Sequence, residues 1–490
     1  MPWRKILRNM FGLDWRSLAL MRMGLAAVIL ADLALGAQHL TAFYTDDGML
    51  PRTELIDWAN PVFCLHLLSG SWWWEAGLFA LEAICALMMF VGYRTRLATV
   101  LCWFLLLSRQ ARNPLLLFGA DIVLRIAMFW AMFLPLNRRY SLDAMEGREQ
   151  PPTTQCYLGV AGFGAIIQFL FVYVISGLLK TGPTWHVEHS AVYYALAIDI
   201  YSRPLGAWLN QFDNVTAFFT ICTLYLEIYG PVLFVLPVFS GWGRLLGFVV
   251  FAALQIGFAI TMEMGLFWTV MIVFNLMLLP AEFWTWFADP IANRLIKWWP
   301  PAITSPPPIP TSSVGANILG RVLRWGRDGA LLVLTAIIVL YNIDTIPNHS
   351  PLLPAGTSDW LDAMGLQQFF NMFAPDPQTQ DGWLVVRGWL QNGRQVDLRT
   401  GASPANLAKP DSVAETYGDE RMASWLIDLE FDEYASCREE YLRYMARQWN
   451  QNHSAAEQVK AAELIFIGQY NEPNHLKSFP QPVTLWTEEF

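Results

Sequence analysis

The sequence predicts a polytopic α-helical membrane protein with a C-terminal mixed α+β domain outside the membrane. The chain has 490 residues, of which 54% are hydrophobic and 15% charged, whereas soluble domains average about 25% charged residues. Long apolar runs are confined to residues 1–345, and the chain beyond them has the composition of an ordinary globular domain. We therefore expect a transmembrane bundle over 1–345 and an outer soluble domain over 346–490.

Nine apolar runs could form membrane-spanning helices, which need about 20 residues each. The runs cover residues 18–37, 72–91, 97–108, 115–136, 157–179, 215–239, 245–262, 265–284 and 329–343. The first run is interpreted as a retained helix and not as a signal peptide, because the charges of Arg22 and Asp32 suit a packed bundle. The third run is short and needs its flanking arginines to reach the membrane interface.

The distribution of Lys and Arg between the runs predicts the orientation of the bundle. If the N-terminus is cytoplasmic, the inner side collects Arg4, Lys5, Arg8, Arg94, Arg96, Arg138, Arg139, Arg148, Arg244, Arg294, Lys297, Arg321, Arg324 and Arg327. The outer side receives only Arg52, Arg109, Arg112, Lys180 and Arg203. This asymmetry indicates an N-in protein of the plasma (inner) membrane, and an odd number of spans then puts the C-terminal domain on the outer face. The proline-rich segment 300–310 is expected to be an extended cytoplasmic linker.

Two kinds of structure are expected in the outer domain. Residues 382–390 alternate imperfectly between apolar and polar, and they are followed by Asn392-Gly393 and a second short run at 395–398, which is a β-hairpin pattern. Residues 411–464 have apolar positions at helical spacing and are expected to be helical.

Charged residues inside apolar runs are costly and therefore are candidates for function. They are Arg22, Asp32, Glu75, Glu82, Asp121, Arg125, Glu227 and Glu263. Asp121 and Arg125 are four residues apart on one helical face and are expected to form an ion pair. Glu75 and Glu82 share a face, but the sequence does not identify their partners. Glu263 lies in a very short outer turn on the same side as Lys180, where an exposed loop glutamate is expected in preference to a site residue.

Several classes of function and site are not expected. The net charge of −9 and the lack of Lys/Arg blocks argue against nucleic acid as a partner. The six cysteines contain no Cys-x-x-Cys pair and no Cys/His spacing typical of zinc, so no metal site is predicted. No nucleophile elbow, phosphate-binding loop, dinucleotide fingerprint or His-Glu-x-x-His motif is present.

Lys180 ends the fifth apolar run and is followed directly by turn residues. It is either an anchor whose amine reaches the membrane interface or a functional amine, and the residues alone leave both interpretations open. An enclosed apolar cavity at the amine would favour function, whereas an amine open to solvent would favour an anchor.

Six short stretches, distributed along nearly the whole chain, together resemble the sequence motifs of a known family. They are residues 43–48, 92–94, 177–185, 264–267, 371–375 and 434–437. This set resembles the vitamin K-dependent γ-glutamyl carboxylase family and its bacterial relatives, the horizontally transferred transmembrane (HTTM) proteins. The resemblance implies a carboxylase-like membrane fold and an enzyme of the lyase or quinol-dependent oxidoreductase class.

The resemblance also implies roles for particular residues. Lys180 matches a lysine that acts as general base on vitamin K hydroquinone, a role that requires a neutral amine and is helped by an apolar pocket. Trp185, Gln255 and Glu263 are then expected to contact a quinol-like or lipid cosubstrate. However, Pro114 and Gln255 stand where the family has histidines, and the chain ends soon after the first outer domain. Carboxylation of propeptide-bearing proteins is therefore not expected.

Two further expectations follow from the resemblance. The carboxylase links matching elements by a disulfide, which implies a bond between Cys64 and Cys437, with two free buried thiols as the alternative. The enzyme would work on membrane lipid or on an exported protein or peptide. The alternative function is a non-catalytic membrane scaffold or binding protein whose outer domain engages an exported partner.

Overall fold

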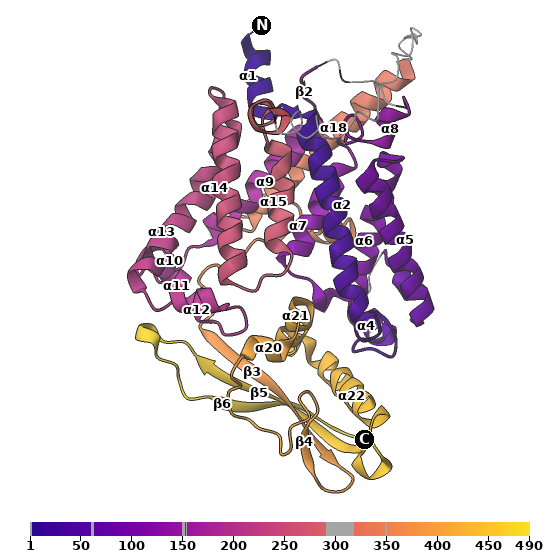
Figure 1. Ribbon diagram of the computed structural model, residues 1–490, viewed down its shortest axis with the longest axis vertical. Helices are drawn as coiled ribbons and strands as arrows, with labels where there is room; N and C mark the ends of the chain where they lie inside the picture. Colours follow the sequence, from indigo (N-terminus) through magenta and orange to yellow (C-terminus); the bar gives the residue numbers. More distant parts are fainter. Residues whose placement is uncertain (1, 60–62, 149–151, 153, 291–317, 348–349) are drawn as a thin grey trace.

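A helical bundle forms one end of the molecule and the C-terminal domain forms the other (Figure 1). The computed structural model describes residues 2–59, 63–148, 152, 154–290, 318–347 and 350–490. The N-terminal helix lies at the bundle end that is far from the C-terminal domain (Figure 1). The proline-rich segment 300–310 lies outside the described residues.

Each apolar run of the sequence contains helix. The main helices of the bundle are α2 (Trp15–Gln38), α5 (Trp72–Val91), α6 (Thr95–Arg112), α7 (Gly119–Ala131), α9 (Val160–Leu179), α13 (Asp213–Tyr229), α14 (Ser240–Thr261), α15 (Phe267–Asn275) and α18 (Ile318–Asp344). The shorter helices are α1 (Pro2–Phe11), α3 (Leu40–Tyr44), α4 (Arg52–Ala59), α8 (Leu142–Met145), α10 (Pro183–His186), α11 (Ala191–Ala197), α12 (Pro204–Leu209) and α16 (Ala281–Phe283). Two short strands, β1 (Leu13–Asp14) and β2 (Cys156–Tyr157), pair antiparallel.

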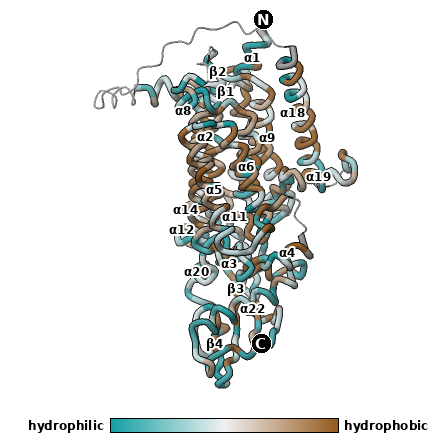
Figure 2. The backbone as a smooth tube through the Cα atoms, turned by 90° about the vertical axis from the view of Figure 1, so that its right-hand side faces the viewer, coloured by the Kyte–Doolittle hydropathy of each residue, from teal (hydrophilic) through white to brown (hydrophobic). Residues whose placement is uncertain are grey.

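Fewer helices qualify as membrane spans than the nine that the sequence predicts. Among the described residues, six are long and apolar enough, namely α2, α5, α9, α13 with its extension to Val235, α14 and α18. A seventh span results if the segment from α15 to Ala288, which bends by 93°, crosses as one. The helices α6 and α7 do not qualify as spans, and each has a physical reason. The helix α6 carries arginines at both ends, and α7 has only 13 residues, nearly all of them buried. Hydrophobic residues dominate the middle of the bundle (Figure 2).

Several charged residues within the bundle are buried and form ion pairs with one another. Arg109 on α6 donates from Nη2 to Asp32 Oδ2 at 2.7 Å and from Nε to Glu82 Oε2 at 3.0 Å, and all three side chains are about 1% exposed. Glu75 has a different partner, since it pairs with His66 from the preceding loop. The two glutamates on one face of α5 therefore neutralise different groups.

The predicted Asp121–Arg125 ion pair is not the pairing of the structure. Arg125 donates to Gln110 Oε1 at 3.3 Å and to the Gln367 carbonyl at 3.4 Å. Asp121 is instead 3.1 Å from Nη2 of Arg421, a residue of the C-terminal domain. A helical spacing of four residues brought Asp121 and Arg125 to one face, but tertiary partners decided the bonds.

The C-terminal domain is built on an antiparallel sheet. Its strands are β3 (Gln380–Leu390), β4 (Gln395–Asp397), β5 (Val459–Tyr470) and β6 (Gln481–Glu489), in the order β4-β3-β5-β6. Its helices are α19 (Thr357–Ala363), α20 (Val413–Tyr417), α21 (Glu420–Asp428) and α22 (Ala435–Gln451). The helix α22 packs on β5 and β6, whereas α20 and α21 lie against the end of the bundle (Figure 1).

The predicted hairpin is confirmed, whereas the helical prediction is right only in part. Strands β3 and β4 pair antiparallel across a turn in which Gly393 has φ +81°, a conformation that glycine adopts readily. Helices cover much of 411–451, but the chain from Val459 is the strand β5. This short apolar run cannot be assigned by periodicity alone, and its pairing with both β3 and β6 makes it a central strand.

The predicted disulfide between Cys64 and Cys437 is absent. All six cysteines belong to the described residues, and all are free thiols. The thiol of Cys64 donates to the Ser108 carbonyl at 3.2 Å, so this cysteine faces the bundle. Cys437 is buried in the first turn of α22, where burial raises the pKa of its thiol to about 11. Both thiols are therefore free, as in the alternative, but Cys437 is buried whereas Cys64 is only half-buried.

Arg421 on α21 joins the C-terminal domain to the buried charges of the bundle. Its Nη2 pairs with both Asp32 on α2 and Asp121 on α7, and its Nη1 donates to the Leu116 carbonyl at 3.1 Å. The Arg421 side chain is 8% exposed and the two carboxylates are 1% and 2% exposed. Unpaired charges in such surroundings are strongly destabilising.

The substitution Arg421→Gln should lower the free energy of unfolding by about 3–5 kcal/mol, because it leaves two buried carboxylates short of a partner. Thermal unfolding of the purified protein in detergent measures the loss. Arg394→Gln is the matched control, since its ion pair with Glu457 is exposed and should contribute less than about 1 kcal/mol. Equal losses for the two variants would contradict the anchoring role of Arg421.

Candidate functional site

Lys180 lies at the C-terminal end of α9, close to α13. A side chain at Gly177 would meet this neighbour, because an added Cβ would lie 2.7 Å from Ile228 Cγ1 and 3.2 Å from Glu227 Cβ. The missing side chain allows the two helices to approach closely at this level. Glu227 is thereby brought within reach of the Lys180 amine.

The Lys180 amine is buried and has three hydrogen-bond acceptors. Nζ donates to Glu227 Oε2 at 2.6 Å, to Ser176 Oγ at 2.7 Å and to the Ser176 carbonyl at 3.4 Å, and the side chain is 3% exposed. Nζ also lies 5.2 Å from the ring centroid of Trp185, which is a cation–π distance. The three protons of an ammonium group therefore all have acceptors. Glu227 was noted in the sequence as a buried charge, but its partner was not predicted.

A loop of the C-terminal domain covers the turn that contains Lys180. The Trp185 indole N–H donates to the Phe373 carbonyl at 2.9 Å, across 188 residues of chain. The Gly182 N–H donates to the Pro375 carbonyl at 3.0 Å, and the Thr184 N–H donates to Asp376 Oδ1 at 3.0 Å. The segment 371–376, which we call the covering loop, therefore covers the Lys180 turn on the side of the C-terminal domain.

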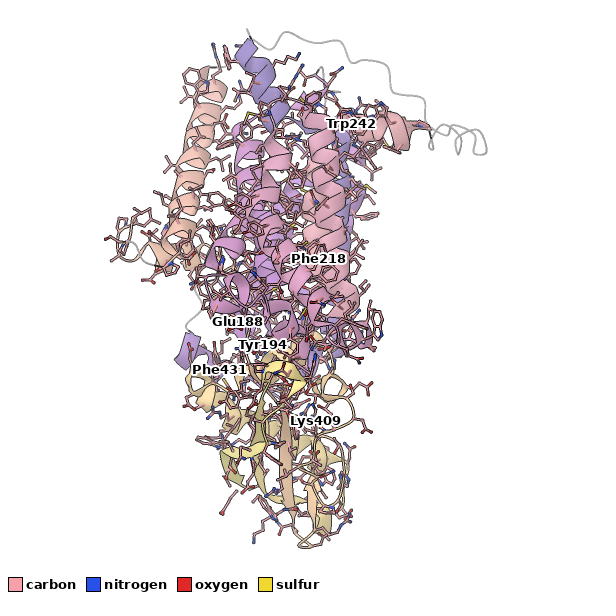
Figure 3. All side chains as sticks on the ribbon, turned by 90° about the vertical axis from the view of Figure 1, so that its left-hand side faces the viewer. Glu188, Tyr194, Phe218, Trp242, Lys409 and Phe431 are labelled. Atoms are coloured by element: carbon pink, nitrogen blue, oxygen red, sulfur yellow. The ribbon has the colours of Figure 1, made fainter. Side chains whose placement is uncertain are left out.

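A cavity of about 560 Å³ lies between the bundle and the C-terminal domain. We call it the junction cavity. It is lined by Leu117, Phe118, Gly119, Ile198, Ile200, Tyr201, Met262, Glu263, Met264, Phe267, Asn371, Met372, Phe373, Ala374, Asp376, Gln378, Ala414, Glu415, Gly418, Asp419, Glu420, Ala423, Ser424, Ile427 and Asp428. Figure 3 shows the level of the junction, with Glu188 and Tyr194 on the bundle side and Phe431 on the side of the C-terminal domain. The size is typical of a small-molecule site.

The structure brings three of the four predicted site residues to the region of the junction cavity, and the fourth, Gln255, lies elsewhere. Glu263 lines the junction cavity. Trp185 packs against Phe373, which also lines the cavity, and the Lys180 amine lies 5.2 Å from the Trp185 ring centroid. Gln255 on α14 is buried inside the bundle, where its side-chain N–H donates to the Tyr173 hydroxyl at 3.1 Å. The amine is thus enclosed, but the cavity does not extend to it.

Glu263 is held by a neighbouring arginine. Arg203 Nη2 lies 2.6 Å from Glu263 Oε2, and Arg203 Nη1 donates to the Ala259 carbonyl at 2.6 Å. The Glu263 N–H donates to the Tyr201 carbonyl at 2.6 Å. The carboxylate at this part of the cavity wall is therefore already neutralised.

Glu420 and Gly265 fit against each other at the cavity wall. Gly265 has φ +44°, and a Cβ added to it would lie 1.1 Å from Glu420 Oε2. Only glycine leaves room for the carboxyl group in this turn. Burial, and then the nearby charge of Asp121, raises the pKa of Glu420 to about 9. Glu420 is therefore a neutral carboxyl group at pH 7.

Two more acidic residues close to the cavity have raised pKa values. Burial and then the charge of Glu433 raise the pKa of Asp428 to about 7. Burial, Asp381 and Asp428 raise the pKa of Glu430 to about 8. No sequence pattern points to these groups or to Glu420, because an acidic residue on a helix or in a turn has the same local pattern whether it meets solvent or another domain.

Comparison of the chain with protein-family models, with curated proteins and with solved structures found no match.

The stability of the protein should fall as pH rises from about 5 to 9. The pKa of Glu420 is raised from 4.5 to about 9 in the fold, so its contribution is fully present below pH 4.5 and is lost as pH rises through 9. One such group contributes a slope of up to about 1.4 kcal/mol per pH unit. In Glu420→Gln, which is neutral at every pH, this part of the slope should disappear.

Unfolding in denaturant between pH 5 and 9 measures these slopes. The control Glu489→Gln removes an exposed carboxylate at the end of β6 and should keep the wild-type slope. If Glu420→Gln also keeps it, the Glu420 carboxyl group is not neutral in the folded protein.

Proposed function

We propose that this protein is a membrane enzyme in which Lys180 acts as general base on a quinol-like or lipid cosubstrate held in the junction cavity. The observation that carries this proposal is the convergence of three separate stretches of the sequence. Residues 264–267 and 371–375 contribute to the cavity wall, and residues 177–185 are bonded to the covering loop. The same three stretches carry the resemblance to the γ-glutamyl carboxylase and HTTM families.

Glu227 supplies the proton acceptor that this role of Lys180 requires. A lysine acts as base only after its ammonium group loses a proton. Glu227 Oε2 is 2.6 Å from Nζ, so the proton passes to a carboxylate that is already hydrogen-bonded. The neutral amine then takes a proton from a hydroxyl group of the cosubstrate.

Trp185 and Phe373 link the amine to the cavity. Trp185 contacts Lys180 and packs against Phe373, which lines the cavity. A cosubstrate that displaces the Phe373 side chain from the cavity wall therefore meets the indole and then the amine. The reaction is not γ-carboxylation of propeptide-bearing proteins, because Pro114 and Gln255 occupy the positions where the resemblance expects histidines.

A non-catalytic scaffold is the alternative, and two observations favour it. The three protons of the Lys180 ammonium all have acceptors within the protein, as in a purely structural ion pair. In addition, β6 is an edge strand with an exposed surface, and an exported partner could pair with such an edge.

We also propose that nine helices cross the plasma (inner) membrane, with the N-terminus in the cytoplasm and the C-terminal domain outside. The helix α7 crosses within the bundle, where its neighbours cover it, whereas α6 crosses at the surface and exposes Leu97, Leu101 and Phe104 to lipid. Support comes from α1 and α8, which lie at the bundle end opposite the C-terminal domain (Figure 1). Arg4, Lys5 and Arg8 on α1 belong to that end, as the positive-inside rule requires of a cytoplasmic face.

The double variant Lys180→Met, Glu227→Gln should slow the oxygen-dependent oxidation of a 1,4-naphthoquinol by about 100-fold or more, since loss of a general base costs at least that much. Changing both partners avoids an unpaired buried charge, and a thermal unfolding scan checks the fold. Lys460→Met, at an exposed position of β5, is the control. Wild-type turnover in the folded double variant would favour the scaffold.

Cysteine labelling tests the orientation. In a background without native cysteines, Asn392→Cys at the hairpin tip should react with a membrane-impermeant maleimide in intact cells. Arg4→Cys should react only after the membrane is permeabilised. The reverse pattern would contradict the N-in arrangement.

A further inference from the structure

We propose that the junction cavity selects an amphiphile with an ammonium head group and rejects ligands with a carboxylate. This inference rests on the proposed function, which makes the cavity the cosubstrate site, and it specifies the chemical class of the cosubstrate. The cavity itself supplies the site, and the charges on its wall supply the selectivity.

The wall of the cavity is acidic without a basic counterpart. Six of its lining residues carry a carboxyl group: Glu263, Asp376, Glu415, Asp419, Glu420 and Asp428. Among the lining residues that the structure describes, none is Lys, Arg or His. A ligand with a carboxylate would find no ion-pair partner among these lining residues, and the ionised acids of the wall would repel it.

Several of the acids already have partners in the protein. Arg203 pairs with Glu263, and His39 Nε2 lies 2.9 Å from Asp419 Oδ2. Asp376 accepts from the N–H of Thr184 and from its hydroxyl group. By contrast, no ion pair of Glu420 or Asp428 is found within the described parts of the chain. These two are the acids that a ligand cation can neutralise.

An ammonium group fits these two acids for a physical reason. Burial makes the ionised carboxylate costly, and a cation inside the cavity removes this cost. The protons of a primary ammonium can be donated to carboxylate oxygens in charge-assisted hydrogen bonds. Binding is therefore coupled to release of protons from the carboxyl groups.

The remainder of the wall suits an apolar chain. Ile198, Met262, Phe267, Met372 and Phe373 lie on it, and such side chains gain free energy by covering a hydrocarbon tail. The cavity also lies where the bundle meets the outer domain, the level at which lipid head groups meet a spanning bundle. This combination favours a lipid-like amine over a basic peptide.

The affinity for an amine should rise with pH. Asp121, Arg421 and Glu263 are the charged groups that act on Glu420, and the pKa of Glu420 is about 9. Glu433 acts on Asp428, whose pKa is about 7, and Glu430 lies close to both Asp381 and Asp428. Between pH 6 and 8.5 an alkylamine stays protonated while these acids approach ionisation. A higher pH therefore lowers the cost of ionising them.

Calorimetric titration with octylamine, octanol and octanoate, which share one tail, tests the selectivity. The full-length protein in detergent is titrated at pH 6 and 8.5. The variant Ala423→Trp, whose indole fills the cavity, is the blank, because it measures the heat of probe uptake by the detergent alone. We expect octylamine to bind at least about tenfold more tightly than octanol at pH 8.5, and octanoate more weakly than octanol. The preference for octylamine should be smaller at pH 6.

Two variants separate the head-group contribution from the tail contribution. Glu420→Gln and Asp428→Asn should each reduce the octylamine preference over octanol by about threefold or more and leave octanol binding unchanged. Glu489→Gln should change neither. Two independent substitutions protect the test against a fault in the folding of one of them.

The possible contrary results are distinguishable. Octanoate binding as tightly as octylamine would overturn the ammonium selectivity but leave the cavity as an apolar site, so the proposed function would stand. If none of the three probes binds above the Ala423→Trp blank, the cavity is not the cosubstrate site and the proposed function fails as well. A trilysine peptide that binds more tightly than octylamine would overturn the lipid-like class in favour of a basic peptide.

Discussion

The insertion of Arg421 between Asp32 and Asp121 is the contact on which the rest of the architecture depends. Two carboxylates inside an apolar bundle need positive partners, and Arg109 supplies only part of the charge. The remaining cation comes from a helix 389 residues after Asp32 in the chain. The bundle therefore needs the C-terminal domain, because Arg421 on α21 supplies a positive charge that the buried carboxylates require.

The same helix creates the candidate site. With Arg421 directed into the bundle, its neighbour Glu420 lies against Gly265, and the next turns of α21 form one wall of the junction cavity. The covering loop forms the opposite side, since it is bonded to the Lys180 turn through Trp185 and Gly182. One docked domain therefore both defines the cavity and encloses the buried amine.

Two sets of charged groups lie near this junction, Lys180 on one hand and Glu420 and Asp428 on the other, and the protein neutralises them in different ways. Lys180 is neutralised by an ion pair with Glu227 inside the protein. Glu420 and Asp428 are neutralised by protons instead, because burial raises their pKa values. Under the proposed selectivity, a ligand with a positive charge lowers the cost of ionising them, and the apolar wall beside them suits a ligand with a tail.

The sequence by itself determined the apolar helices, the β3–β4 hairpin and the stretches that meet at the junction, because length, periodicity and turn residues are local properties. It could not identify the partner of Asp121, the strand β5, the number of helices that qualify as spans or the free state of Cys64 and Cys437. Only the tertiary structure decided that Glu227 faces Lys180, that Gln255 lies apart and that the half-buried Glu420 lies against Gly265. These outcomes depend on which distant surfaces meet, and a carboxylate or a thiol looks the same in the sequence whether it faces water, lipid or another domain.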